Sequence, residues 1–422
     1  MYPKRSAEYC APLRFCPTFK KYSTTIPTMK TYFLYKSTFT PRFILVLLAI
    51  AFIVTIGARA DDAPQTLALS RKPYIQSTTA HSIQIVWDTN IPTRAFLQYK
   101  LKDVAESQPN FQNANTLILA QLQTHHHSIL HNLQASSVYD YRVGAQGKVL
   151  FTGQFQTNKT ASQNYQFDVW GDSGGEGQKA LAAQIDKSNP DFLLHTGNLT
   201  SSKGAAEDFN PSFFDIYQKV LSCVPFYGAL GNQGIGADNG QPFLDAFVFP
   251  QNGPDGVTPE RNYYVDYANA RIAVIDSNQD ETTLQSKIVP WLERVMSSSN
   301  ATWKFAVLHH PAYSSGPHGD TARIQKVLSP IFAKLHLDII FAGHDHQYER
   351  FKPIDGVTYI VTGAGGAGRY PRKTENPQTA FYWNDDWSFT QIQISHENGK
   401  NVLRGKQTST TGAVVDQWEL SK

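Results

Sequence analysis

Residues 337–350 read LDIIFAGHDHQYER, an apolar run followed by a glycine and two histidines one residue apart. The apolar residues up to Ala342 predict a buried strand, and Gly343 permits a sharp turn at its end. His344 and His346 then face the same side of an extended segment, roughly 7 Å apart. Two imidazoles so placed can bind one metal ion, or one each of a pair about 3.5–4 Å apart. Taken alone, the same pattern also describes an ordinary polar strand end.

Four earlier apolar runs end in the same way, which favours the metal-binding interpretation. They cover residues 166–170, 191–195, 225–230 and 304–308, and the polar residues that follow them include Asp172, Asn198, Asn232 and His309. Helical patterns at 178–188 and 213–221 separate the first three runs, which predicts an α/β domain. The carboxyl ends of its strands meet at one edge, where α/β enzymes build their sites. A carboxylate, amides and histidines at that edge suit a divalent transition metal.

Residues 70–157 have a different pattern. Ile83, Ile85 and Trp87 alternate with polar residues, and short runs at 95–99 and 139–143 repeat this alternation. Short alternating strands separated by turns predict a β-sandwich of about 90 residues. Its three consecutive histidines, 125–127, alternate between strand faces, so at most two could share a metal, and a solvated strand edge is the simpler interpretation. The polar stretch 157–163 predicts a linker.

The first 60 residues differ in composition from the rest of the chain. Residues 1–42 carry eight Lys/Arg and one acid, residues 43–56 are almost wholly apolar, and Ala58 and Ala60 are small residues two apart. This pattern predicts a secretory signal cleaved after Ala60, and hence a secreted or periplasmic protein. An uncleaved membrane anchor is the alternative, although the apolar run is shorter than the ~20 residues of a spanning helix.

Removal of residues 1–60 reverses the sign of the net charge. They hold nine of the 38 basic residues and one of the 35 acidic residues, so the formal charge of +3 becomes −5. Nothing in the remainder indicates a nucleic-acid surface, and no membrane association is expected after cleavage. One of the three cysteines, Cys223, remains, so no internal disulfide is expected. We expect Cys223 to be buried.

The region from about 165 to 395 resembles the calcineurin-like metallophosphoesterases, and with the preceding sandwich it resembles the purple acid phosphatases. The family motifs G-D-x-G and G-H-x-H match residues 171–174 and 343–346, and His309 matches the histidine of V-x-x-H. The sandwich resembles a fibronectin type III domain. The resemblance implies a β-sandwich plus an α/β metallophosphoesterase domain of two stacked mixed sheets flanked by helices. We expect a signal segment at 1–60, domains at 70–157 and 165–395, and a C-terminal tail at 396–422.

The resemblance also implies roles for individual residues. One ion would be bound by Asp172, His346 and the residues at 198 and 201. The other would be bound by Asn232, His309, His344 and the residue at 198. His318, in the loop 311–319, would contact the phosphate as a candidate catalytic acid. Asn232 and Gln233 would also face the substrate, Gln233 at a catalytic position.

Three of these positions depart from the family pattern. The second motif reads Gly197-Asn198-Leu199-Thr200-Ser201, so Asn198 replaces a bridging aspartate and Ser201 replaces a tyrosine. Gln233 replaces a histidine, and glutamine cannot titrate. Two divalent ions about 4 Å apart repel strongly, and a neutral asparagine does not offset that repulsion as a carboxylate does.

The sequence therefore predicts one divalent transition metal ion, Fe, Zn or Mn, rather than two. It predicts a secreted hydrolase of phosphoric monoesters that uses metal-activated water at a degraded site. The alternative is an inactive pseudo-phosphatase that binds a phosphate-bearing ligand or partner. A structural module with a relict pocket is less compatible with the retained ligand residues. The Gly-rich stretch 363–368 fits no nucleotide fingerprint and predicts a tight loop packed near the site.

Overall fold

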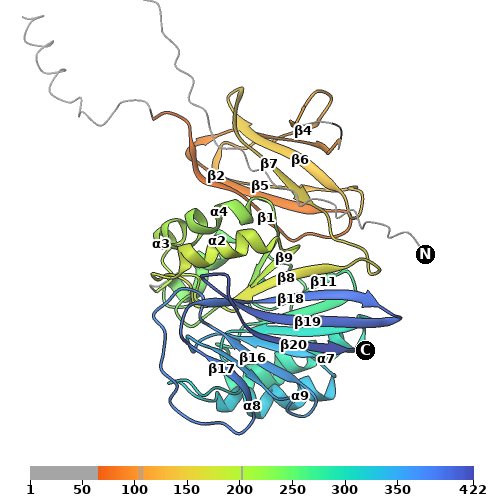
Figure 1. The fold of residues 1–422 in the computed structure, drawn as a ribbon. Coiled ribbons are helices and arrows are strands. Elements are labelled where there is room, and N and C mark those ends of the chain that lie inside the picture. Colours follow the sequence, from red (N-terminus) through yellow and green to blue (C-terminus); the bar gives the residue numbers. More distant parts are fainter. Residues whose placement is uncertain (1–64, 104, 106–107, 201–202) are drawn as a thin grey trace, which may run out of the picture.

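The computed structural model describes residues 65–422, except 104, 106–107 and 201–202. The expected signal segment and Ser201 therefore lie outside the described residues. The described chain forms two domains, one stacked on the end of the other (Figure 1). None of the helices in this part of the chain is long and apolar enough to cross a membrane.

The N-terminal domain is the predicted β-sandwich. One sheet has the order β1-β2-β5, and the other has the order β4-β3-β6-β7. The inward side chains of both sheets, such as Trp87 and Tyr141, form one buried cluster. His126 is buried and stacks on Trp87, whereas His127 on the opposite face is exposed. The strands are β1 Leu69–Gln76, β2 Ile83–Thr93, β3 Ala95–Leu101, β4 Asn115–Ile118, β5 Gln123–Leu130, β6 Val138–Ala145 and β7 Lys148–Gln156.

The second domain contains two mixed sheets. The six-stranded sheet has the order β10-β9-β8-β18-β19-β20. Its strands are β8 Tyr165–Trp170, β9 Phe192–His195, β10 Phe226–Gly228, β18 Ser388–Glu397, β19 Lys400–Ser409 and β20 Val414–Ser421. The seven-stranded sheet has the order β11-β12-β13-β14-β16-β15-β17. Its strands are β11 Tyr263–Tyr267, β12 Ala270–Ile275, β13 Trp303–Leu308, β14 Ile339–Ala342, β15 Tyr348–Phe351, β16 Thr358–Thr362 and β17 Thr379–Trp383.

The two sheets stack because their central strands are apolar on both faces. In β13, Phe305 and Val307 belong to the cluster between the sheets, and Ala306 and Leu308 belong to the cluster under the outer helices. The Phe167 ring of β8 lies 5.6 Å from that of Phe305 across this layer. Parallel strands buried on both faces read as continuous apolar runs, as the sequence does here.

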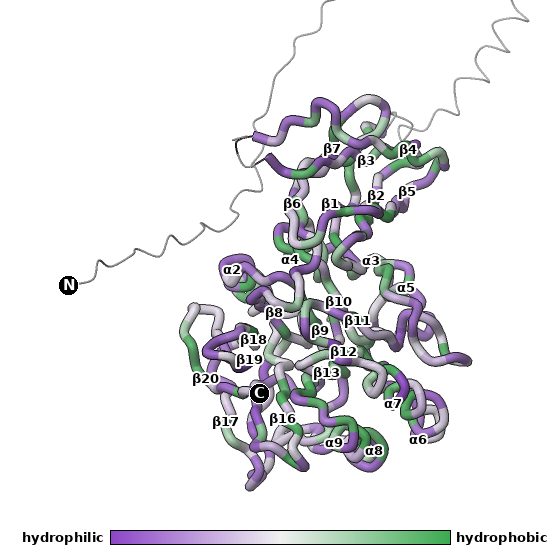
Figure 2. Tube along the Cα trace, turned by 90° about the vertical axis from the view of Figure 1, so that its right-hand side faces the viewer, coloured by the Kyte–Doolittle hydropathy of each residue, from purple (hydrophilic) through white to green (hydrophobic). Residues whose placement is uncertain are grey.

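Helices cover the outer faces of both sheets. In the view of Figure 2, helices α5, α6 and α7 lie on the opposite side of the molecule from β19 and β20. The described helices are α2 Gln178–Ser188, α3 Ala206–Phe209, η1 Asn210–Phe214, α4 Asp215–Leu221, η2 Asp238–Gly240, α5 Gln241–Ala246, α6 Glu281–Thr283, η3 Leu284–Ile288, α7 Val289–Ser297, α8 Ala322–Val327 and α9 Ser329–Lys334.

Residues 396–422 are not the tail that the sequence analysis expects. They contain all of the two strands β19 and β20; β19 pairs antiparallel with β18, and β20 pairs antiparallel with β19. The expectation failed because several buried positions of β19 are polar. Gln407 is fully buried, and its amide bonds the hydroxyls of Thr390 and Ser388 on β18. A polar side chain satisfied in this way looks solvent-facing in the sequence. Cys223 is half-buried rather than buried.

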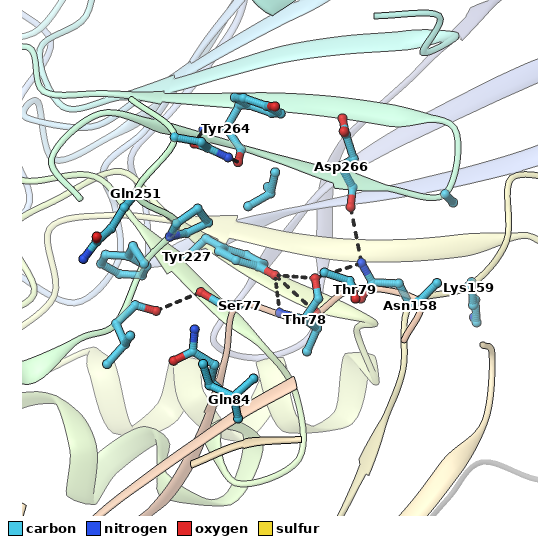
Figure 3. Close-up of a pocket in the computed structure, with 18 of the residues that line it drawn as sticks. Ser77, Thr78, Thr79, Gln84, Asn158, Lys159, Tyr227, Gln251, Tyr264 and Asp266 are labelled. Atoms are coloured by element: carbon cyan, nitrogen blue, oxygen red, sulfur yellow. Dashed lines mark hydrogen bonds between the residues drawn. The ribbon is translucent and has the colours of Figure 1, made fainter. Parts of the chain in front are cut away.

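The two domains share a buried contact. The Tyr141 hydroxyl donates to the Ser222 carbonyl at 2.8 Å, and the Tyr74 hydroxyl donates to the Ala246 carbonyl at 2.6 Å. A cavity of about 800 Å³ lies beside this contact (Figure 3). Tyr227 and Asn158 in its wall bond the Thr78 backbone. This cavity lies away from the strand ends that carry the predicted site.

Candidate metal centre

The predicted ligand residues follow five strands that end at one edge of the stacked sheets. Strands β8, β9 and β10 are parallel neighbours in one sheet, and β13 and β14 are parallel neighbours in the other. Asp172, Asn198 and His344 each follow a glycine and have a left-handed backbone, with φ of 57°, 56° and 71°. Non-glycine residues held in this region cost roughly 1–3 kcal/mol and cluster at functional sites.

Gly343 is required by the close approach of β14 to β8 and β9. A Cβ at this position would lie 2.5 Å from both Asp172 Oδ2 and Thr196 Oγ1. Because that distance is far below van der Waals contact, any side chain here would displace Asp172. The backbone N–H of the next residue, His344, donates to Asp172 Oδ2 at 2.7 Å. The glycine of the G-H-x-H motif therefore lets β14 bind the carboxylate that follows β8.

Asn232, His309 and His344 bring three candidate donor atoms together. His309 Nε2 lies 2.7 Å from Asn232 Oδ1 and 3.2 Å from His344 Nδ1. His309 Nδ1 faces the Thr196 carbonyl at 3.0 Å, so Nδ1 carries the proton and Nε2 presents a lone pair. Burial, together with neighbouring His310 and His344, lowers the pKa of His309 well below its usual value. The ring is therefore neutral, as a metal ligand must be.

Asp172 and His346 form the other part of the predicted site. His346 Nδ1 faces the Gly368 carbonyl at 2.5 Å, which leaves Nε2 unprotonated and 3.7 Å from Asp172 Oδ1. Burial raises the pKa of Asp172 to about 8, although bonds from the His344 backbone and Asn198 oppose this rise. No third carboxylate or imidazole completes this part among the described residues. Ser201, at the position of the family's tyrosine, is not described.

The carboxamide of Asn198 lies between the two parts. Its Nδ2 is 2.9 Å from Asp172 Oδ1, 3.0 Å from Asn232 Oδ1 and 3.1 Å from His309 Nε2. Its Oδ1 accepts the backbone N–H of Gln233 at 2.9 Å. An N–H donor thus occupies the position where the resemblance expects a bridging carboxylate.

Among the described residues, the donor set fits one ion and does not fit two. Asn232 Oδ1, His309 Nε2 and His344 Nδ1 converge, and an amide oxygen with two imidazoles suits a transition metal. Within the described residues, no group of three or more His, Cys, Asp or Glu side chains is placed to hold a metal ion. Asp172 and His346 alone do not complete a second position. A bridge from residue 198 is absent, because its Nδ2 rather than an oxygen faces the ligands.

His318 lies beside this set on the loop that follows β13. Its backbone N–H and Nδ1 both bond Asp345 Oδ1, at 3.1 and 2.8 Å. Its ring centroid is 4.1 Å from that of His344, and its side chain is 44% exposed. Because Nδ1 is engaged, Nε2 is the nitrogen left to meet a ligand. Gln233 is half-buried, and its backbone N–H contacts the site by donating to Asn198 Oδ1.

Two residues near the site were missed by the sequence analysis. Tyr370 stacks on His346, with ring centroids 4.0 Å apart and an interplanar angle of 12°. Buried Asp345 orients His318 and also accepts the Ser314 hydroxyl. Its place between the two motif histidines was a usable signal. For Tyr370 the signal was the preceding stretch 363–368, which packs near the site as expected, with Ala367 N–H bonding the Asp172 carbonyl at 2.9 Å.

Comparison with known families agrees with this architecture. Residues 166–348 match the family model of the calcineurin-like phosphoesterases, and residues 71–169 match that of the purple acid phosphatase N-terminal domain. The chain therefore contains a calcineurin-like metallophosphoesterase domain preceded by a purple acid phosphatase N-terminal domain. Members of this family use dinuclear metal centres.

Several relatives share this family. Purple acid phosphatase 3 of Arabidopsis thaliana is 23% identical, over 59% of this chain and 75% of its own length. Tartrate-resistant acid phosphatase type 5 of Mus musculus is 24% identical over 51% of this chain and 76% of its own length. A protein named probable inactive purple acid phosphatase 1, also from Arabidopsis thaliana, is 25% identical over 70% of this chain and 57% of its own length.

Solved structures support the fold. A purple acid phosphatase from yellow lupin seeds aligns with a TM-score of 0.70 and 18% identity, covering 83% of this chain and 74% of that one. The structure of PhoD aligns with a TM-score of 0.61 and 12% identity, covering 84% and 94%.

Proposed function

We propose that this protein is an exported purple acid phosphatase-like hydrolase of phosphoric monoesters that works with one divalent transition metal ion, Fe, Zn or Mn. The observation that carries the proposal is the convergence of Asn232 Oδ1, His309 Nε2 and His344 Nδ1. An ion held there would supply Lewis-acid polarisation of the phosphoryl oxygen and activation of water.

The residues around this set would bind and orient the ester. His318 faces it with Nε2 available, while Asp345 fixes the other ring nitrogen. That geometry suits His318 to donate a hydrogen bond to a phosphoryl oxygen or a proton to the leaving oxygen. Tyr370, stacked on His346, would limit the orientation of the group attached to the phosphate.

We expect slow turnover. A histidine at position 233 could donate a proton near neutral pH, and Gln233 cannot. A positioned general acid contributes roughly 10²- to 10⁴-fold to the rate of such a reaction. The loss of one ion lowers the rate further, because a single ion cannot stabilise both the attacking and the leaving oxygen as a pair does.

A second candidate function is phosphoester binding without turnover. It is favoured by the Asn198 Nδ2 group, which already bonds Asp172 and Asn232 without any ion. A protein of this kind would act as a receptor for a phosphorylated ligand. The two candidates differ in whether the purified protein hydrolyses an aryl phosphate.

Measurement of p-nitrophenyl phosphate hydrolysis, with and without added Mn²⁺ or Zn²⁺, tests the proposal on residues 61–422. We expect weak metal-dependent activity, and a gain of roughly 100-fold or more in the double variant N198D/Q233H. Exposed Asn300 and Gln378 offer a matched control, N300D/Q378H, that should not change the rate. No activity in the wild type together with tight phosphate binding would favour the receptor. No gain in the double variant would refute the one-ion hydrolase.

We also propose that the mature protein begins at Asp61 and acts outside the cytoplasm on small phosphoesters or phosphorylated ligands. The composition of residues 1–60 and the net charge of −5 beyond them support this location and the lack of a nucleic-acid partner. N-terminal sequencing of the protein from culture medium or periplasm tests the cleavage. An intact N-terminus in the membrane fraction would instead indicate an anchor.

A further inference from the structure

The side chain of Asn198 is held in one orientation by groups on both of its sides. Its Oδ1 accepts the Gln233 backbone N–H, which can only donate, so the atom at this end must be the oxygen. The opposite end must then be the NH₂ group. It faces Asp172 Oδ1, Asn232 Oδ1 and the unprotonated Nε2 of His309. The oxygen end is therefore matched to a donor, and the two hydrogens of the NH₂ end are shared among three acceptors.

The acceptors around this NH₂ group would otherwise face one another. Asn232 Oδ1 and His309 Nε2 are 2.7 Å apart, and both present lone pairs. Asp172 and His309 are almost fully buried, so water does not compensate them easily. Leaving a buried acceptor without a partner is costly, and acceptors this close need a positive group between or beside them. A metal ion or an N–H donor can supply it.

An aspartate at position 198 would create a different situation. One of its oxygens would still accept the Gln233 N–H, and the other would face Asp172 Oδ1, Asn232 Oδ1 and His309 Nε2 without bringing a hydrogen to them. Such a set favours a cation, because oxygen and nitrogen lone pairs held this close repel one another. The asparagine supplies the two missing hydrogens from the chain itself. Asparagine in place of aspartate at position 198 therefore removes a metal ligand and also supplies the N–H groups that make an ion unnecessary.

We propose that the Asn198 carboxamide takes the place of the bridging ion, so that the resting protein has a metal-free centre closed by hydrogen bonds. An ion can enter only when the Asn198 carboxamide rotates and its NH₂ group leaves these acceptors. This rotation breaks the Gln233 N–H bond and the three contacts of Nδ2. This inference rests on the proposed function and deepens it. It specifies that an ion must compete with the Asn198 NH₂ group for the same acceptor atoms.

The proposal predicts how stability responds to metal. Wild-type protein should melt at the same temperature in a chelator and in about 100 µM Zn²⁺ or Mn²⁺, because the Asn198 NH₂ group already serves these acceptors. Asn198→Asp should melt at a lower temperature in the chelator. It should recover by on the order of 5 °C in the metal, the shift expected when an ion is present at about 100 times its dissociation constant. The exposed control Asn300→Asp should behave as wild type in both conditions.

The experiment uses residues 61–422, with melting followed by calorimetry and Zn²⁺ or Mn²⁺ binding followed by titration. The expected result is a wild-type affinity at least about 100-fold weaker than that of Asn198→Asp. Equal affinities overturn the proposal, as does a wild-type dissociation constant below about 1 µM. If Asn198→Asp does not fold, the metal content of the wild type decides. Less than about 0.1 ion per chain supports the proposal, and any larger content overturns it.

These results separate the inference from the proposed function. A metal-free wild type that binds ions weakly but never hydrolyses phosphoesters would refute the hydrolase and leave the inference intact. A wild type that holds an ion firmly would refute the inference, whatever its activity.

Discussion

Asp168 should make the folded protein less stable as the pH rises from 4 to 7. This residue lies in β8, four residues before Asp172, and its side chain is fully buried. It accepts bonds from the Ser188 hydroxyl and from Gln391 Nε2. Burial raises its pKa to about 7, and these bonds and nearby Lys406 only partly oppose the rise. The carboxyl is therefore protonated in the folded state at pH values where the unfolded chain has already released the proton.

The sign and size of the effect follow from the two pKa values. The folded value exceeds the unfolded value of 3.8, so the stabilisation is complete below pH 3.8 and is lost as pH rises through about 7. A difference of about 3 pKa units corresponds to about 4 kcal/mol of unfolding free energy. The variant Asp168→Asn keeps the shape but cannot ionise. Its stability relative to wild type should therefore rise by roughly 3 kcal/mol between pH 4.5 and 7.5.

Urea denaturation at several pH values in this range measures the difference. The exposed control Asp255→Asn should give a curve parallel to that of wild type. If Asp168→Asn also ran parallel to wild type, the buried carboxyl would be ionised already at low pH. The assumption that burial dominates its surroundings would then be wrong. The bonds of the Asp168 carboxyl go to Ser188 and Gln391 and not to the candidate ligands, so this test is independent of metal content.

Two further predictions concern the domain contact and the site. Tyr141→Phe removes the buried bond to the Ser222 carbonyl and should lower the unfolding free energy by about 1–2 kcal/mol, measured by urea denaturation; an unchanged midpoint would show that the bond is not formed. Gly343→Ala should abolish the phosphatase activity gained by N198D/Q233H while the far-UV circular dichroism is unchanged, because the new Cβ displaces Asp172. Retained activity would contradict the close approach of β14 to β8.

The strand ends were predictable from the sequence for a physical reason. Parallel strands buried on both faces are long apolar runs, and their carboxyl ends meet at one edge. The sequence alone therefore predicts that Asp172, Asn198 and His309 lie together. The strands β19 and β20 were missed for the opposite reason. Their buried polar side chains, such as Gln407, are satisfied by cross-strand bonds, and pairing partners cannot be read from local composition.

The orientation of the Asn198 carboxamide lay beyond the sequence, because it depends on a backbone group. The N–H of residue 233 reaches Oδ1 only because β9 and β10 are neighbours in the sheet. That N–H is present whichever side chain occupies position 233. If the proposal holds, the change at 198 is sufficient to keep the ion out, whereas the change at 233 removes only a group that could titrate. Asn198→Asp alone should restore metal affinity without a proton donor, and Gln233→His alone should leave the centre metal-free. This asymmetry between the single variants separates the loss of the ion from the loss of the acid.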